Sequence, residues 1–483
     1  RRGGQRRGAG RLRLPRLARA VTTVPKAATT VEDMSDFLAE ALPGFNASVQ
    51  VVDSSLGKGL GLVARRDFKE GDVLYAWGVD DGTVMVPVDK FADQLASEDF
   101  GALALQVLKK KMSDRPNAFK AWLETGVEAP EVHPLRLVTE DAGQAKMVWS
   151  STTCGARMSA AALALREDVE ALSGQVEIEE WAATVALVMS RTIVTEDDGK
   201  PLLVLGLDLV QDGEDPNVEA RCVYTQVNAG MFGDGGELEL SRIVFVAKQD
   251  ILAGEELTAQ YLESPHGGRY LEQYGFIPSR LRGELSDGAV ELVFEPSDEE
   301  EDFHYYNKES MLENIDMKMG PMSFIFTTDD DLIQLENGLP WEYQSTLDRM
   351  SRILRLRFTG GAESYLIDSV YVDALWDNCA YAISKENELN VCEYVINECN
   401  MWLKRFAAQD EANEPESEIQ QLAADLRRTE KELLERVRDV FVQEQKETKY
   451  DETRKYWADR QLDVVFPERA SRGGLTGVEG FDY

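Results

Sequence analysis

Polar side chains follow an apolar run in the stretch "LDLVQDGEDPN", from Leu207 to Asn217. The run before it, "LLVLG", predicts a strand, and "VEARCVYTQV" predicts a second strand after it. Gln211, Asp212 and Gly213 therefore stand at the end of a strand, where many folds place their binding and catalytic loops. Carboxylates and a carboxamide at such a position can hydrogen-bond a ligand. A solvated turn is the alternative interpretation.

Two tyrosines further along the chain could also do chemistry. Tyr261 and Tyr274 are thirteen residues apart and follow the acidic turn "GEEL". A phenol can donate or accept a hydrogen bond beside a charged reactant, although a single buried tyrosine more often belongs to a core. The glycine-rich run "GKGLGL" allows a backbone to approach a ligand closely, and an ordinary hairpin would use the same residues.

The cysteines do not favour a metal site. There are five of them, without any Cys-x-x-Cys pair: Cys154, Cys222, Cys379, Cys392 and Cys399. The last two are seven residues apart, a spacing that places both on one face of a helix. We therefore expect no structural zinc and no other metal. An odd number of cysteines in a long chain suits a reducing compartment.

The charge is strongly acidic and unevenly spread. The chain of 483 residues has 52 basic and 87 acidic side chains, yet residues 1–31 contain eight Arg, one Lys and no acid. An acidic surface repels phosphate backbones, so we expect no nucleic-acid partner. Basic protein segments fit it better, and simple solubility is the alternative.

The opening segment 1–31 is rich in Arg and in small and hydroxyl residues. This composition is typical of an organelle transit peptide, and a disordered basic arm is the alternative. We expect delivery to a plastid (chloroplast), with the mitochondrion as the alternative. No window of about 18 uncharged apolar residues occurs, so we expect no membrane span.

The periodicity of apolar residues divides the chain into blocks. Strand-like alternation covers four of them: 49–87, 202–210, 218–227 and 238–248. Helical periodicity covers 89–191 and returns from about 330 to 446, after an acidic linker around "EPSDEEEDF". The predicted fold class is therefore α+β: a β-rich core split by a helical insertion, followed by an all-helical domain.

Two short segments tie the strand blocks together. "RDFKEGDVLY" (66–75) and "QDILAGEELT" (249–258) share the form Asp-apolar-x-x-Gly-acid-x-apolar. Each predicts a strand, a tight turn assisted by glycine, and another strand. Because they lie in the first and last strand blocks, they favour a shared architecture over a coincidence between two hairpins.

Four segments, in order, resemble SET-domain proteins of the Rubisco large-subunit methyltransferase type. They are "GKGLGLVARRDFKEGDVL", "VMSRTI", "GLDLVQDGEDPNVEA" and "DILAGEELTAQYLESPHGGRYLEQYGF". The resemblance covers roughly residues 45–445 and includes the separation between Tyr261 and Tyr274. It implies a SET core with a helical insertion at about 90–195, and a helical domain like the family's substrate-binding domain.

The resemblance also implies an activity, the transfer of a methyl group from S-adenosylmethionine to a protein lysine. Tyr261 matches the family's catalytic tyrosine. The positions that match cofactor-binding residues are Lys58, Gly59, Leu60, Arg191, Gln211, Asp212, Tyr274 and Phe276. By the same resemblance, Tyr274 and Phe276 line either the adenine pocket or the lysine channel. The implied partner is a protein substrate.

The chain departs from the family pattern in its central segment. Gln211, Asp212 and Gly213 stand where the family has Asn-His-Ser, and Lys58 stands where it often has an acid. A catalytically lapsed SET-like subunit of an organellar assembly is therefore the alternative function. If the site is otherwise intact, restoring Asn at 211 and His at 212 is expected to strengthen cofactor binding.

These expectations give a division of the whole chain. It comprises a transit-peptide-like segment at 1–31, a SET domain at 32–280, an acidic linker at 281–302, a helical substrate-binding-like domain at 303–446 and a polar tail at 447–483.

Overall fold

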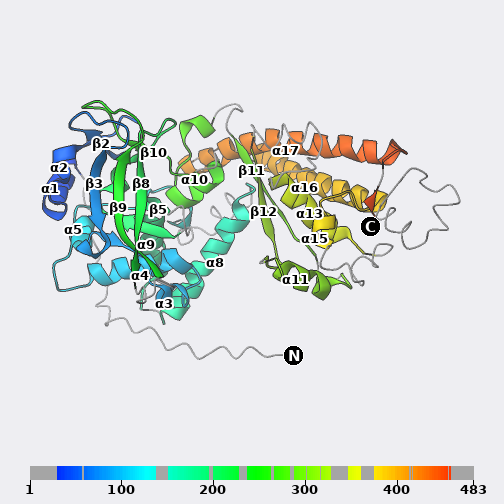
Figure 1. Ribbon diagram of the computed structural model, residues 1–483, viewed down its shortest axis with the longest axis horizontal. Helices are drawn as coiled ribbons and strands as arrows, with labels where there is room; N and C mark the ends of the chain where they lie inside the picture. Colours follow the sequence, from blue (N-terminus) through cyan, green and yellow to red (C-terminus); the bar gives the residue numbers. More distant parts are fainter. Residues whose placement is uncertain are drawn as a thin grey trace. The chain divides into compact units, whose positions relative to one another are not determined.

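The computed structural model describes residues 30–457 in two compact units (Figure 1). Not described within that range are 57–58, 137–150, 174, 195–199, 228–236, 263–265, 283–287, 298, 301, 316, 328–345, 361–374, 413–414, 416 and 455. The first unit contains described residues up to Pro278, without 151–154 and 266–267, which belong to the second unit with the residues from Ser279 onward. Lys58 and the segment 1–29 lie outside the described residues.

The first unit is built from small sheets whose strands come from both ends of its sequence. β3 (Val73–Gly78) pairs antiparallel with β9 (Glu237–Ala247), which pairs with β8 (Val218–Val227), and Figure 1 shows the three side by side. β4 (Val84–Met85) joins β6 (Pro201–Val204), which also pairs with β5 (Thr192–Val194). The prediction that the early and late strand blocks meet is therefore confirmed.

The two similar hairpins contact each other in a nearly symmetric way. Phe68 and Ile251 exchange backbone hydrogen bonds of 2.9 Å in both directions. The Asp67 carboxylate accepts from the Ala253 amide at 2.9 Å, and the Asp250 carboxylate accepts from the Glu70 amide at 3.2 Å. The turn glycines of both hairpins have positive φ, a backbone conformation that is strained for residues with a Cβ. The repeated sequence form thus corresponds to a paired structural unit.

Two smaller sheets complete this unit. β1 (Val49–Asp53) pairs antiparallel with β2 (Leu60–Ala64), and β7 (Gln211–Asp212) pairs in parallel with β10 (Thr258–Ala259). The second pairing brings the polar stretch at 207–217 beside the segment that leads to Tyr261. Because parallel strands need a long connection, this contact joins residues that are almost fifty positions apart.

Helices surround these sheets. They are α1 (Val31–Ala41), α2 (Phe45–Ser48), α3 (Asp89–Ala92), α4 (Glu98–Lys111), α5 (Ala118–Glu124), α8 (Gly155–Ala171), α9 (Ile178–Arg191) and α10 (Gly267–Tyr274). Asn117 caps the N-terminus of α5, because its side chain accepts a hydrogen bond from the Lys120 amide. α4 packs on α9, and both helices bury apolar side chains around most of their circumference.

The second unit combines a pair of antiparallel strands with helices. β11 (Ala289–Phe294) pairs antiparallel with β12 (Met322–Thr327). The helices are α11 (Tyr305–Glu313), α13 (Thr346–Phe358), α15 (Leu375–Asn378), α16 (Lys385–Ala412) and α17 (Glu418–Tyr450). The α+β class is confirmed, but the expectation of an all-helical second domain is wrong in this respect. β11 also occupies part of the predicted linker at 281–302.

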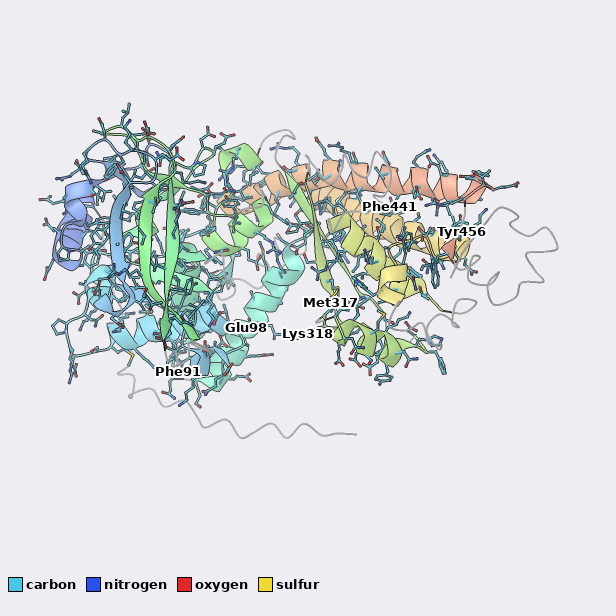
Figure 2. All side chains as sticks on the ribbon, viewed as in Figure 1. Phe91, Glu98, Met317, Lys318, Phe441 and Tyr456 are labelled. Atoms are coloured by element: carbon cyan, nitrogen blue, oxygen red, sulfur yellow. The ribbon has the colours of Figure 1, made fainter. Side chains whose placement is uncertain are left out.

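An apolar core holds the second unit together. Ile419, Leu422, Leu426, Leu433 and Val437 of α17 are buried, as their helical spacing predicts. Phe441 and Met317 join this core, and Tyr456 is buried just beyond α17 (Figure 2). The Trp457 amide donates to the Ala382 carbonyl at 2.8 Å, so the chain after α17 turns back onto its own unit.

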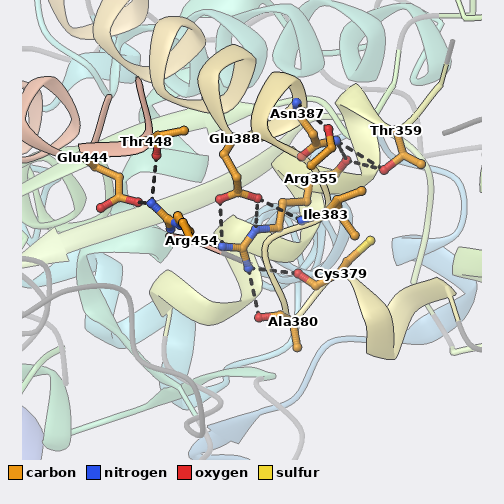
Figure 3. Close-up of polar contacts among 11 residues, drawn as sticks. Arg355, Thr359, Cys379, Ala380, Ile383, Asn387, Glu388, Glu444, Thr448 and Arg454 are labelled. Carbon is orange, nitrogen blue, oxygen red and sulfur yellow. Dashed lines mark hydrogen bonds and ion pairs between the residues drawn. The ribbon is translucent and has the colours of Figure 1, made fainter. Parts of the chain in front are cut away.

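A polar network is buried in the same unit (Figure 3). The Arg355 guanidinium donates to both carboxylate oxygens of Glu388 at 2.8 and 3.1 Å, and also to the carbonyls of Cys379 and Ala380. Arg454 donates to Glu444 at 2.5 Å. Four of the five N–H donors of Arg355 are thus used, which reduces the cost of burying its charge. None of the described helices has both the length and the apolar composition of a membrane span.

Candidate active site

Asp208 fixes the first part of the loop at 207–217 through hydrogen bonds of its side chain. Its buried carboxylate accepts hydrogen bonds from the Gly206 amide at 2.8 Å and from the indole N–H of Trp122 at 3.1 Å. Burial raises the pKa of Asp208, while nearby Arg191 and these hydrogen bonds oppose the rise. Gly206 has a φ of 91°, where a side chain would strain the backbone. Asp208 therefore anchors the loop and does not face a ligand.

Asn217 fixes the far end of the same loop. Its side-chain oxygen accepts from the Thr258 amide at 2.9 Å, and its amide group donates to the Glu256 carbonyl at 2.9 Å. A Cβ added to Gly213 would lie 2.5 Å from the Thr258 side chain, so the strands approach too closely for any residue but glycine. Both ends of the loop are thus fixed by the chain's own residues.

Tyr261 lies directly against this loop. Its hydroxyl donates to the Val210 carbonyl at 2.6 Å, and its backbone amide donates to the Asp212 carboxylate at 3.1 Å. Burial raises the pKa of the Tyr261 hydroxyl well above its usual value; the carboxylates of Asp212 and Asp208 add to the rise, and Arg191 opposes it. The hydroxyl therefore stays protonated at neutral pH, and its proton is directed to a carbonyl.

An aromatic cluster surrounds Tyr261. Its ring centroid lies 4.6 Å from that of Tyr274 and 6.3 Å from that of Phe276. The Tyr274 hydroxyl donates to the Tyr261 carbonyl at 3.3 Å, and burial raises the pKa of this hydroxyl as well. Such rings form apolar walls with polar edges. The two sequence-predicted tyrosines and Phe276 are therefore brought together.

Tyr270 is a member of this cluster that the sequence analysis missed. It is fully buried, and its ring centroid lies 5.8 Å from that of Phe276 and 5.9 Å from that of Tyr274. Its hydroxyl donates to the Asp212 carboxylate at 2.8 Å. The spacing of Tyr270 and Tyr274 by four residues on α10 was the available signal, because residues i and i+4 share a helix face.

The glycine-rich segment reaches the loop through Gln211. The Gln211 side-chain amide donates to the Leu60 carbonyl at 2.6 Å. Gly59, which precedes Leu60, has a φ of 108°, and beyond its chain neighbours no atom of the described residues lies within 4 Å of the position that its Cβ would take. The backbone at Gly59 and Leu60 is therefore adjacent to the loop at 207–217, and Lys58 lies outside the described residues.

Arg191, at the end of α9, also joins the site. One guanidinium nitrogen donates to the Asp208 carbonyl at 3.2 Å. Its Nε is buried and has no hydrogen-bond partner among the residues that the structure describes. A buried donor without a partner is costly, so this nitrogen is suited to bind an anionic group of a ligand. Within the described ranges, no cluster of side chains could hold a metal ion.

The comparison with known protein families agrees with this geometry. Residues 59–262 match the SET domain family. This part of the chain is a SET domain. The matched range begins at the glycine-rich segment and ends just after Tyr261, so it contains both sides of the contact between β7 and β10. Tyr274 and Phe276 of the aromatic cluster follow the matched SET range.

Two curated plant proteins resemble this SET-domain chain. The chloroplastic Rubisco large-subunit N-methyltransferase of Nicotiana tabacum is 26% identical over 235 residues, which is 47% of this chain and 41% of that relative. The match therefore spans less than half of the tobacco protein. The chloroplastic [fructose-bisphosphate aldolase]-lysine N-methyltransferase of Arabidopsis thaliana is 21% identical over 443 residues, covering 88% of this chain and 83% of the relative.

A solved structure shares the fold. The SET domain of LSMT bound to lysine and AdoHcy superposes with a TM-score of 0.63 and 17% identity, covering 90% of this chain and 95% of that one. At this identity the match establishes the fold alone. It extends well beyond the SET domain, because its coverage includes most of the second unit.

Proposed function

We propose that this chain is a protein-lysine N-methyltransferase that uses S-adenosylmethionine. The observation that carries the proposal is the fixed Tyr261 hydroxyl inside an aromatic cluster at the end of a SET domain. Both curated relatives are N-methyltransferases by name, and the solved relative was captured with lysine and AdoHcy. The site residues suit that chemistry.

The acceptor must be a neutral amine. A free lysine has a pKa near 10.4, so its neutral form is scarce at pH 7 unless the surroundings disfavour charge. The rings of Tyr261, Tyr274 and Phe276 supply apolar surroundings. We therefore assign them to the lysine channel, where they exclude water and align the amine for in-line attack.

The hydroxyl of Tyr261 has a fixed hydrogen-bond direction. Its proton is directed to the Val210 carbonyl, so the oxygen lone pairs remain available to another group. Lone pairs can accept from an amine N–H, and they stabilise a nearby cation. S-adenosylmethionine, when bound, supplies a methyl group on a sulfonium cation. Tyr261 is thus suited to hold the amine and to favour positive charge at the reacting centre.

The methyl donor, S-adenosylmethionine, would be held by residues of the glycine-rich segment and by the residue at the end of α9. The free Nε of Arg191 suits a carboxylate, and the open backbone at Gly59 and Leu60 suits close approach of a small ligand. Gln211 and Asp212 lie between these groups and the aromatic cluster. We assign Lys58 to the same site from its sequence position.

The expected assignments for the rest of the chain remain part of the proposal. We propose a protein substrate, a plastid location, a transit peptide at 1–31 and a substrate-binding role for the C-terminal unit. Both curated relatives are chloroplastic by name, which supports a plastid over a mitochondrion. The lapsed-subunit alternative loses its main support, because Gln211 and Asp212 have well-defined hydrogen-bond partners within the site.

The test is transfer of a labelled methyl group from S-adenosylmethionine by the purified full chain. The acceptors are the Rubisco large subunit and fructose-bisphosphate aldolase, as suggested by the names of the relatives, and a plastid protein extract. We expect label on a lysine with the wild type and a loss of at least tenfold with Tyr261→Phe, since one positioned hydroxyl contributes on the order of 1.5–3 kcal/mol near charge. Equal labelling by both proteins would contradict the assigned role of Tyr261.

A further inference from the structure

The Asp212 carboxylate makes two hydrogen bonds through one oxygen. Its Oδ1 accepts from the Tyr261 backbone amide at 3.1 Å and from the Tyr270 hydroxyl at 2.8 Å. Asp212 lies in β7 opposite Ala259 of β10, two residues before Tyr261. The carboxylate therefore links three elements: the polar loop, the segment that carries Tyr261, and α10.

We propose that Asp212 and Tyr270 form a positioning pair that sets the place of Tyr261 for methyl transfer. This inference rests on the proposed function. Three hydrogen bonds fix Tyr261. Its hydroxyl donates to the Val210 carbonyl, its amide donates to Asp212, and its carbonyl accepts from the Tyr274 hydroxyl. Asp212 acts on the reaction through the backbone of Tyr261, and Tyr270 acts through Asp212.

The two members of the pair require each other. Tyr270 is fully buried, and a buried hydroxyl needs an acceptor. Asp212 is half-buried, and a carboxylate removed from water needs donors; a hydrogen bond to a charged group is stronger than a neutral one. The Tyr270 hydroxyl and the Tyr261 amide supply two donors to one oxygen. A phenylalanine at position 270 would remove one of them.

A histidine at position 212 would not serve the same network. The Tyr261 amide and the Tyr270 hydroxyl are both donors, and a neutral imidazole has a single acceptor nitrogen. One of the two donors would lose its acceptor. The carboxylate at 212 is thus matched to the tyrosine at 270, and restoring His alone should weaken the site. This reverses the expectation drawn from the sequence, where Asp212 was a sign of a lapsed motif.

The test compares four variants of the full chain in the methyl-transfer assay. Asp212→Asn keeps an acceptor oxygen at the same place, Asp212→Ala removes it, and Asp212→His offers one acceptor nitrogen. The fourth variant combines Asp212→His with Tyr270→Phe, so that a single donor meets a single acceptor. Glu214→Gln is the matched control, because it removes an exposed acid from the same loop.

We expect kcat to fall about 10–100-fold with Asp212→Ala and Asp212→His, while the KM of the protein acceptor changes less, since the loss is one of alignment. Asp212→Asn should retain kcat within about tenfold. Adding Tyr270→Phe to Asp212→His should recover much of the loss. The control should equal the wild type. Equal losses for Asn and Ala, or no recovery in the combined variant, would overturn the pair.

A second readout does not depend on activity. Hydrogen exchange of the Tyr261 amide should accelerate in Asp212→Ala and Asp212→His and stay near the wild-type rate in Asp212→Asn and Glu214→Gln. If the wild type transfers no methyl group, the proposed function fails, and this exchange still decides the pair. Unchanged exchange in Asp212→Ala would refute it. Should Asp212→Ala not fold, unchanged exchange in Asp212→His would refute it equally.

Discussion

Glu430 of α17 should make the stability of the second unit fall as pH rises. Its carboxylate is fully buried and accepts hydrogen bonds from the amide and hydroxyl of Thr153, at 3.0 and 2.8 Å. Burial raises the pKa of Glu430 from 4.5 to about 8; the nearby Glu291 carboxylate adds to the rise, and the Thr153 hydrogen bonds and Arg427 oppose it. Between these two pH values the unfolded chain releases a proton that the folded unit retains.

The sign and size follow from proton linkage. A group that binds its proton more tightly in the folded state stabilises that state fully below its unfolded pKa, and this contribution is lost as pH rises toward the folded pKa. Each pH unit lowers the free energy of unfolding by about 1.4 kcal/mol. The wild type should therefore lose about 4–5 kcal/mol of stability between pH 4.5 and 8, relative to a variant whose side chain does not titrate. Glu430→Gln is that variant, since its amide can accept from the Thr153 N–H and donate to its hydroxyl oxygen.

The assay is urea unfolding at pH 5.5, 6.5 and 7.5. Hydrogen exchange of α17 amides monitors the unfolding of the second unit. The unfolding free energy of the wild type minus that of Glu430→Gln should fall steadily across this series. Glu447→Gln, an exposed glutamate of the same helix, is the control and should give a flat difference. A flat or rising difference for Glu430→Gln would refute the reasoning.

Three further changes have defined outcomes. Burial lowers the pKa of His133 to about 4, so the first unit should lose stability as pH falls from 6.5 toward 4, and His133→Gln should remove this loss in acid unfolding curves. Gly213→Ala should destabilise by about 1–3 kcal/mol, seen as a lower melting temperature, because its Cβ would meet Thr258 at 2.5 Å. Arg355→Met should cost about 3–5 kcal/mol in urea unfolding, since it leaves the Glu388 charge buried without its partner; a cost below 1 kcal/mol would contradict this.

The sequence predicted those parts of the site that are fixed by local spacing. The glycine turns, the tyrosine pair and the repeated hairpins are short segments whose order alone suggested that they meet, and the pairing of β3 with β9 and of β7 with β10 brings them together. The role of Asp212 could not be predicted in this way. It depends on how α10 is placed against β7, and no local sequence pattern determines that placement.

The strands of the second unit were missed for a different reason. β11 reads "AVELVF" and carries the buried Glu291 in its middle, so its alternation is broken by a charge and it lies beside an acidic segment. Its partner β12 pairs with it across an intervening helix, α11. Strand pairing of this kind is stabilised by non-local packing, which a window of sequence does not contain.

The most direct test of the central claim is a calorimetric titration of the purified full chain with S-adenosylmethionine. We predict that each chain binds one molecule of S-adenosylmethionine. Tyr261→Phe should retain this binding, because Tyr261 is assigned to the amine, whereas Arg191→Met should weaken it about tenfold or more through loss of a charged hydrogen-bond donor. A folded wild type that gives no binding heat and no shift of its melting temperature with the donor would contradict the claim.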